Sequence, residues 1–231
     1  MYPRRAPAGF GNPDTNDSAR QPRAKPLKRP RQARAKFTVQ AIFDAFVRIW
    51  RDSGWDTLTT RAVALETGIS IGTLYEYFPG KQALLSGYFR HCVETLMAQI
   101  DAQVIAPPEL DWKERTHRLV ALTCSKQAAE LPYFDAGMLQ LETQIAELKH
   151  HVRVYEELSA KWIAAFDICR DLPHKPDAEV VRALFTAAWG ARRYLLLINA
   201  DEATAARFVA EMERMCHGRL LQSDPPHAGG T

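Results

Sequence analysis

Apolar side chains in the first patterned stretch of the chain recur at steps of three and four residues. From Phe37 onward they are Val39, Ile42, Phe43, Phe46, Ile49 and Trp50. This spacing places them on one face of a helix, which we expect to end near Gly54 because glycine commonly terminates helices. Residues 1–33 precede this helix, and they hold six of the fourteen prolines and few apolar side chains. Because such a segment cannot bury enough surface to offset the entropy of ordering, we expect it to be disordered.

Two short helices follow, separated by a glycine turn. Thr59 is placed to cap a helix over TTRAVALET, which stops at Gly68. Ser70 can cap a third helix that ends at Pro79-Gly80. Three short helices in succession, with a turn between the second and the third, match a helix-turn-helix layout.

The rest of the chain also has helical spacing. We expect helices over 81–105, 110–130, 133–147, 149–171, 176–199 and 202–220. Pro176 is expected in the first turn of its helix, where Asp177 and Glu179 suit the helix dipole. No segment keeps the alternation of a β-strand, so the sequence predicts an all-α protein of about nine helices.

Composition and charge narrow the class of protein. The chain is 46% hydrophobic and 25% charged, which is ordinary for a globular protein. No run of 18 apolar residues and no signal-peptide pattern is present, so we expect a cytoplasmic location and no membrane span. Four scattered cysteines fit a reducing compartment better than a disulfide framework or a zinc site. The net charge is +8 over residues 1–36 and −5 over the remainder. This basic leader is either a phosphate-binding arm or simply a solvated tail.

The third predicted helix, within SIGTLYEYFPGK, has a composition suited to a DNA groove. Gly72 would let backbone approach a duplex closely, and Thr73 offers both a hydroxyl and a methyl group. We expect Leu74 and Phe78 to point inward. The hydroxyls of the two tyrosines, Tyr75 and Tyr77, and the ammonium of Lys81 could then reach phosphate oxygens. The aromatic count alone leaves open that both tyrosine rings belong to the core.

The segment ISIGTLYEYFPGKQALL, preceded by TTRAVALETG, closely resembles the N-terminal domain of the tetracycline-repressor (TetR/AcrR-like) family. The resemblance covers about residues 37–86. It implies a homodimeric DNA-binding repressor whose helical C-terminal domain dimerises through its last two helices and holds an effector pocket. Two DNA-binding domains related by a two-fold axis would require a palindromic operator in double-stranded DNA.

The resemblance also assigns roles to residues. Thr59 and Arg61 would contact the DNA backbone, Gly72 and Thr73 the base edges, and Tyr75, Tyr77 and Lys81 the phosphates, with Ser70 and Ile71 completing the DNA-binding set. Two assignments stay open. Ile71 would either touch a thymine methyl or pack partly on the second helix, and Glu76 would either accept from a cytosine or turn to solvent.

The resemblance and the helical pattern together suggest four segments. These are a disordered basic tail over 1–33, a helix-turn-helix domain over 34–80, an effector-binding and dimerisation domain over 81–220 and a disordered tail over 221–231.

The helices near 176–199 and 202–220 carry broad apolar faces that suggest a dimer interface. The residues are Val180, Val181, Leu184, Phe185, Ala188 and Trp189 in the first helix, and Phe208, Val209, Met212, Met215 and Cys216 in the second. Gly190 and Ala191 would allow close approach. Two such helices from each of two chains can form a four-helix bundle, although the same faces would also suit an intramolecular core.

An effector pocket is harder to locate from the sequence. Its candidate lining residues are Met97, His117, Thr123, Phe134, Met138, Trp162, Phe166 and Trp189. For each of them an ordinary core position is the alternative. The adjacent pair His150-His151 splays around a helix and has no set of ligands at metal spacing, so we expect no metal and no cofactor.

The predicted function is a ligand-responsive transcriptional repressor that a small, largely apolar effector releases from DNA. Motifs of serine hydrolases, zinc proteases, nucleotide-binding loops and dinucleotide-binding folds are absent, so we expect no enzyme. The alternatives are a DNA-binding regulator without a small-molecule effector, either partner-controlled or architectural, and an activator. An internal cavity would favour a ligand.

Overall fold

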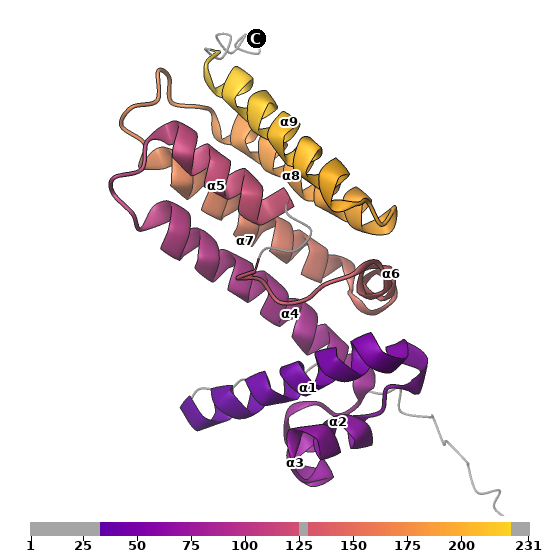
Figure 1. Ribbon diagram of the computed structural model, residues 1–231. Coiled ribbons are helices and arrows are strands. Elements are labelled where there is room, and N and C mark those ends of the chain that lie inside the picture. Colours follow the sequence, from indigo (N-terminus) through magenta and orange to yellow (C-terminus); the bar gives the residue numbers. More distant parts are fainter. Residues whose placement is uncertain (1–32, 125–128, 223–231) are drawn as a thin grey trace, which may run out of the picture.

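A computed structural model of the chain describes residues 33–124 and 129–222, and this part of the chain is helical throughout (Figure 1). The elements are α1 (Ala33–Thr57), α2 (Thr60–Thr67), α3 (Ile71–Tyr77), α4 (Lys81–Ile100), a π-helical turn η1 (Asp101–Ile105), α5 (Trp112–Cys124), α6 (Ala136–Ile145), α7 (Leu148–Asp167), α8 (Ala178–Leu197) and α9 (Glu202–Leu220). No strand occurs among these described residues. The predicted all-α class with about nine helices is confirmed.

Helices α1 to α3 form a unit at one end of the molecule, as Figure 1 shows. The continuous part of α1 ends at Gly54, where a φ of 74° breaks the helix as expected from the sequence. The side chain of Thr59 caps α2 by accepting from the Ala62 N–H (3.1 Å). At the other end of α2, Gly68 has a left-handed conformation, with φ 74° and ψ 25°, which a glycine adopts without strain. These local signals confirm the predicted helix-turn-helix.

The helix α4 joins two hydrophobic cores. Leu84, Leu85 and Tyr88 from its first half pack into the core of the α1–α3 unit. Leu96 and Ile100 from its second half belong to the larger core formed with α5, α7, α8 and α9. One continuous helix is therefore shared by both parts of the molecule, and Figure 1 shows it running from one into the other.

The far end of α4 is held by a buried arginine. The guanidinium of Arg115 on α5 donates to the carbonyl oxygens of Val104, Pro107 (2.7 Å) and Leu110 (3.2 Å). The Val104 carbonyl lies in the last turn of η1, and those of Pro107 and Leu110 follow it, so the arginine replaces bonds that a continuing helix would make. The α-helix itself ends at Ile100, and the π-helical turn η1 continues it to Ile105, where the sequence predicted the end.

Several helix ends differ from the sequence prediction. The predicted helix over 110–130 is wrong at its C-terminal end, because residues 129–130 form a turn, while 125–128 lie outside the described part. Helix α6 begins at Ala136 rather than 133, because Asp135 caps it and accepts from the Met138 N–H (2.8 Å). Helix α7 ends at Asp167, four residues before the predicted end.

The start of α8 is a further correction. Asp177 is the N-cap of this helix, since its carboxylate accepts from the Glu179 N–H (2.8 Å). Pro176 therefore precedes the helix and does not lie in its first turn. The predicted range of α9 matches the structure.

The expected disorder of the two tails, 1–33 and 221–231, falls almost entirely outside the described residues. Only Ala33, which begins α1, and residues 221–222, which follow α9, are described. Within 33–124 and 129–222, no helix has both the length and the apolar character needed to cross a membrane.

Candidate nucleic-acid interface and adjoining cavity

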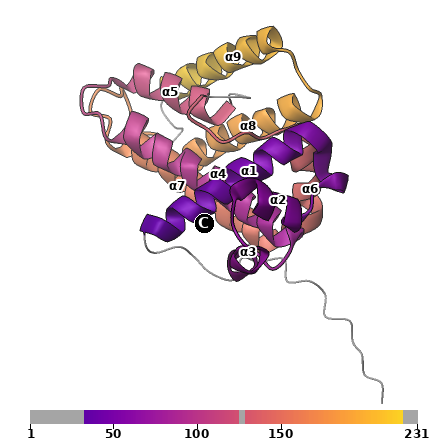
Figure 2. The same cartoon turned by 60° about the horizontal axis from the view of Figure 1, so that its bottom comes forward.

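Helix α3 is exposed at the tip of the α1–α3 unit (Figures 1 and 2). Its inner side chain, Leu74, and the following Phe78 are buried in the core with Val63, as the sequence predicted. Ile71 and Tyr75 point outward and remain 39% and 45% exposed. The outer surface of α3 is therefore exposed enough to enter the groove of a DNA duplex.

The N-terminus of α3 carries a pair of hydroxyl groups. The Ser70 oxygen caps the helix by accepting from the Thr73 N–H (3.0 Å), and it lies 2.9 Å from the Thr73 hydroxyl oxygen. This bond fixes the rotamer of the half-buried Thr73. The exposed Gly72 lies between the two, and a Cβ added there would meet nothing closer than the Ser70 Oγ at 3.6 Å. Crowding within the protein therefore does not explain why a glycine, rather than a residue with a side chain, stands at position 72.

Tyr75 connects α3 with the beginning of α2. Its hydroxyl lies 3.3 Å from the hydroxyl of Thr60, directly after the capping residue Thr59. Backbone N–H groups at a helix N-terminus favour anions, and here they lie close to a phenol and two threonines. The arrangement is suited to a phosphate group of a DNA backbone. Thr60 was not predicted from the sequence, where it looked like an ordinary first helical residue.

Lys81 and Tyr77 are less exposed than the sequence suggested. The Lys81 ammonium donates to the Trp55 carbonyl (3.2 Å) and lies 4.4 Å from the centre of the Trp55 ring. An ammonium has three donors, so two remain for a phosphate. The Tyr77 ring is only 8% exposed and packs in the core beside Phe78. Phosphate binding by both residues stays a prediction.

The charges on this surface are partly balanced within the protein. Arg48 of α1 donates to Glu66 of α2 (2.8 Å), which offsets one carboxylate near the proposed DNA face. Arg61 is exposed on α2, and Glu76 is exposed on α3.

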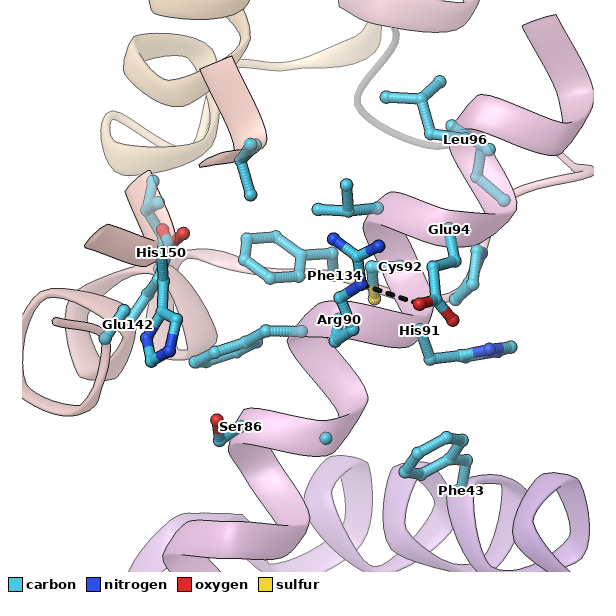
Figure 3. Close-up of a pocket in the computed structure, with 18 of the residues that line it drawn as sticks. Phe43, Ser86, Arg90, His91, Cys92, Glu94, Leu96, Phe134, Glu142 and His150 are labelled. Carbon is cyan, nitrogen blue, oxygen red and sulfur yellow. Dashed lines mark hydrogen bonds and ion pairs between the residues drawn. The ribbon is translucent and has the colours of Figure 1, made fainter. Parts of the chain in front are cut away.

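A cavity of about 700 Å³ lies where the α1–α3 unit meets the larger helical core. Its walls come from α1, α4, α6, α7, α8 and the segment that precedes α6. Figure 3 shows Phe43 on α1 at one end, Arg90 and Phe134 near the middle, and Glu142 and His150 at one side. The cavity therefore contacts both the candidate DNA-binding unit and the core.

Polar groups of the cavity are organised by ion pairs and by burial. Arg90 donates to Glu94 (2.7 Å) and to Glu157 (2.6 Å), and Figure 3 shows the first of these pairs. Burial raises the pKa of the Cys92 thiol to about 12, so this thiol stays protonated and is a poor nucleophile. Burial also lowers the pKa of His91, which stacks on Phe43 with 5.0 Å between ring centres.

A second set of contacts ties α6 to α1. The Trp50 indole N–H and the Tyr133 hydroxyl both donate to Asp135 Oδ2, at 2.8 and 3.0 Å. The Trp50 ring also lies against Gly137, where an added Cβ would approach it to 3.2 Å. Since Asp135 also caps α6, one carboxylate holds the start of α6 and the end of α1 together.

Comparisons with known proteins agree with this geometry. Residues 35–87 match the family described as bacterial regulatory proteins, tetR family. This match covers α1 to α3 and the start of α4, which carry the helix-turn-helix. The chain is a TetR-family transcriptional regulator. Proteins of this family are DNA-binding regulators rather than enzymes, and they typically dimerise.

Solved structures share the fold of this regulator at low sequence identity. A TetR-family transcriptional regulator from Streptomyces coelicolor has a TM-score of 0.53 and 20% identity, over 80% of this chain and 99% of its own. The repressor AlkX from Dietzia, implicated in biodegradation of n-alkanes, has a TM-score of 0.54 and 17% sequence identity. The match covers 83% of this chain and 97% of AlkX. The fatty acid degradation regulator FadR from Bacillus halodurans has a TM-score of 0.54 and 18% sequence identity. The match covers 80% of this chain and 95% of FadR. No curated protein sequence gives a significant match.

Two of the eight pocket residues predicted for this regulator, Phe134 and Trp189, line the cavity. The others do not. The residues Met138, Trp162, Phe166 and Thr123 are buried in the two cores, and Met97 packs against the larger one.

The remaining one, His117, lies on the surface of the regulator. Its Nδ1 is 2.8 Å from Glu213 of α9, so it joins α5 to α9 instead of facing a ligand.

The predicted dimer faces of this regulator are also placed differently. Val181, Leu184, Phe185, Ala188, Met212 and Cys216 belong to the core of the protomer itself, so for them the intramolecular alternative holds. A different face of α8 and α9 is left exposed.

Sequence reasoning missed the polar half of the cavity in this regulator. Arg90, Arg192 and Arg193 line it, although each reads as a solvent-facing charge on an amphipathic helix. The adjacent arginines Arg192 and Arg193, which follow the apolar stretch Ala187–Ala191 of α8, are the signal that could have found it.

Proposed function

We propose that this regulator is a repressor that binds a palindromic operator as a homodimer in the cytoplasm and is released by a small-molecule effector. The observation that carries DNA recognition is the outward face of α3, where Ile71, Gly72 and Tyr75 are exposed beside the Ser70–Thr73 hydroxyl pair. In a helix-turn-helix this second helix enters the major groove. Thr73 and Gly72 would read base edges, while Thr59, Arg61, Tyr75 and Lys81 would bind phosphates.

The exposed face of α8 and α9 supports the proposed homodimer. On α8 the exposed residues recur at steps of three and four: Ala183, Ala187, Gly190, Tyr194 and Leu197. Met215 on α9 and Leu221, which directly follows α9, are apolar side chains that are also exposed. Small residues in such a stripe let helix backbones approach closely. A dimer formed here would present two α3 helices about one duplex turn apart, roughly 34 Å, on a two-fold axis.

A glycine substitution tests the dimer. A Cβ at Gly190 would meet no atom within 4 Å in the protomer. Gly190→Leu should therefore leave the protomer folded and disrupt the dimer, which sedimentation velocity would measure. Ala160→Leu, on an exposed position of α7, is the matched control. A dimer of unchanged affinity in Gly190→Leu would contradict this interface.

The cavity supports control by a ligand rather than by a protein partner. Its volume of about 700 Å³ lies within the usual range of small-molecule sites, and it reaches from α1 to α8. A ligand that fits one arrangement of these helices better than another would shift the dimer between DNA-competent and released states. A strong change in operator occupancy needs a differential affinity of a few kcal/mol.

Selection of bound sequences from a random duplex pool tests the recognition surface. We expect wild type to enrich an inverted repeat. Thr73→Val removes the hydroxyl but keeps the shape, and it should change the base preference within each half-site. Tyr75→Phe should weaken binding at all sequences alike. Thr143→Val, in a helix away from this face, is the control.

The outcome separates the alternatives. An unaltered preference and affinity in Thr73→Val would refute base reading by this residue, and enrichment of no sequence would favour an architectural role. Repression or activation then follows from whether the operator overlaps the promoter, which a reporter assay with the selected sequence measures.

A further inference from the structure

We propose that Ile71 is a specificity-determining residue of this regulator, and that its side chain reads the 5-methyl group of one thymine in each half of the operator. The inference rests on the proposed entry of α3 into the major groove, and it names the base that this helix selects. It also decides between the two alternatives that the sequence left open for Ile71, the other being partial packing on the second helix.

The first support is the outward position of Ile71. Ile69, two residues earlier, packs against the core of the α1–α3 unit, whereas Ile71 is 39% exposed. Leu74 and Tyr77, on the inner side of α3, are buried. An exposed isoleucine gains free energy when an apolar group covers it, and the thymine methyl is such a group on the floor of the major groove.

The second support is the chemistry of the rest of α3. Its sequence, IGTLYEY, contains no arginine, lysine, asparagine or glutamine, the side chains that bind guanine or adenine through two hydrogen bonds. Gly72 has no side chain, the Thr73 hydroxyl can bind any base, and the Glu76 carboxylate can only accept. Among the four bases only thymine carries a methyl group on its major-groove edge. An apolar contact by Ile71 therefore selects a single base.

The third support is the register between Ile71 and Tyr75. The two residues are four apart, so they share one face of α3 and lie about 6 Å apart along its axis. The Tyr75 hydroxyl lies 3.3 Å from that of Thr60, where a phosphate is proposed to bind. A recognition helix enters the groove with its first residues. With Tyr75 at the phosphate, Ile71 therefore lies one helical turn closer to the base edges.

Replacement of thymine by deoxyuridine tests the inference, because both pair with adenine in the same way and differ in the methyl group. The operator enriched by wild type is synthesised with deoxyuridine at one thymine position at a time, in both halves. Fluorescence anisotropy at a fixed salt concentration then measures binding of the full-length regulator. We expect one position at which the change lowers the affinity about fourfold per half-site, the effect of uncovering one methyl group.

Variants of Ile71 assign this effect to the residue. Ile71→Ala should bind the thymine operator more weakly than wild type and should no longer distinguish thymine from deoxyuridine at that position. Ile71→Val, which keeps a branched apolar side chain, should retain part of the preference. Val152→Ala, on an exposed apolar position of α7 (46%), is the matched control and should keep the whole of it.

A second pair of duplexes separates the methyl contact from any change in the flexibility of the DNA. Cytosine and 5-methylcytosine are placed at the same position, each opposite guanine. Wild type should bind the methylated duplex more tightly, again by about fourfold per half-site, and Ile71→Ala should bind the two equally.

The outcomes distinguish this inference from the proposed function. Equal binding of thymine and deoxyuridine by wild type at every position would overturn the inference and leave DNA recognition by α3 intact. An enriched operator without thymine in its half-sites would have the same meaning. A preference that persists in Ile71→Ala would assign the methyl contact to another residue and overturn it as well. If no sequence is enriched, the inference falls together with the proposed function.

Discussion

The carboxylate of Asp135 offers the sharpest test of how α6 is coupled to α1. Its Oδ1 caps α6 by accepting from the Met138 N–H, while its Oδ2 accepts from Trp50 and Tyr133. Asp135→Asn keeps an oxygen for the cap, because asparagine caps helices as well as aspartate does. It places an NH₂ group against the indole N–H, so two donors face each other.

The expected loss in the free energy of unfolding follows from these contacts. The Tyr133 hydroxyl can rotate and accept from the new amide, so one charge-assisted bond is lost and the Trp50 donor, in a largely buried ring, has no acceptor. We expect Asp135→Asn to lower the free energy of unfolding by about 1.5–3 kcal/mol. Asp135→Ala also removes the cap and should cost about 1 kcal/mol more.

The assay is urea unfolding followed by circular dichroism at a single protein concentration, because the proposed dimer would make stability depend on concentration. In a Trp50→Phe background the conflicting donor is gone, so Asp135→Asn should cost about 1–2 kcal/mol less than in wild type. A coupling energy below about 0.5 kcal/mol would refute the proposed link between the two helices. Loss of helix α6 alone in Asp135→Asn would show that the cap was not preserved.

Three further predictions follow from the described contacts. Gly72→Ala should leave the free protein as stable or up to about 1 kcal/mol more stable, yet weaken operator binding, as unfolding and fluorescence anisotropy would show; equal operator affinity would contradict close backbone approach. Arg115→Met should lower the free energy of unfolding by about 2–4 kcal/mol, since three carbonyls lose a charged donor, and a cost below about 1 kcal/mol would mean that water replaces it. Burial lowers the pKa of His91 below its ordinary value of 6.5, so the unfolded chain binds a proton first and stability should fall as pH drops through 6.5. His91→Gln should reduce this slope in unfolding measured between pH 7.5 and 5.5, and an unchanged slope would place the titrating group elsewhere.

The helix-turn-helix could be predicted from the sequence because its signals are local. Thr59 and Ser70 each cap the helix that follows them, and Gly68 adopts the left-handed turn that ends α2. Leu74 and Phe78 are four residues apart, so the inward face of α3 followed directly from helical geometry. None of these inferences needed knowledge of a distant part of the chain.

The cavity could not be predicted in the same way, because it depends on which faces meet. Trp162 and Trp189 look alike in a helical pattern, yet the first lies in the core, where its indole N–H donates to Thr123 (3.2 Å), and only the second reaches the cavity. Arg192 reads as a solvated charge until Phe134, more than fifty residues earlier, is placed beside it. The exposed face of α8 was likewise misjudged, because its most apolar side was needed for the protomer's own core.

The sharing of α4 between two cores has a consequence for how the proposed dimer would align with the two halves of an operator. Twenty residues of helix span about 30 Å, so a pivot of about 5° at one end moves the other by roughly 2.6 Å. If the two subunits of the proposed dimer pivot in opposite directions, the separation of their α3 helices changes by about 5 Å. Since successive base pairs are about 3.4 Å apart, such a small tilt is enough to shift the second α3 helix by more than one base pair along the DNA.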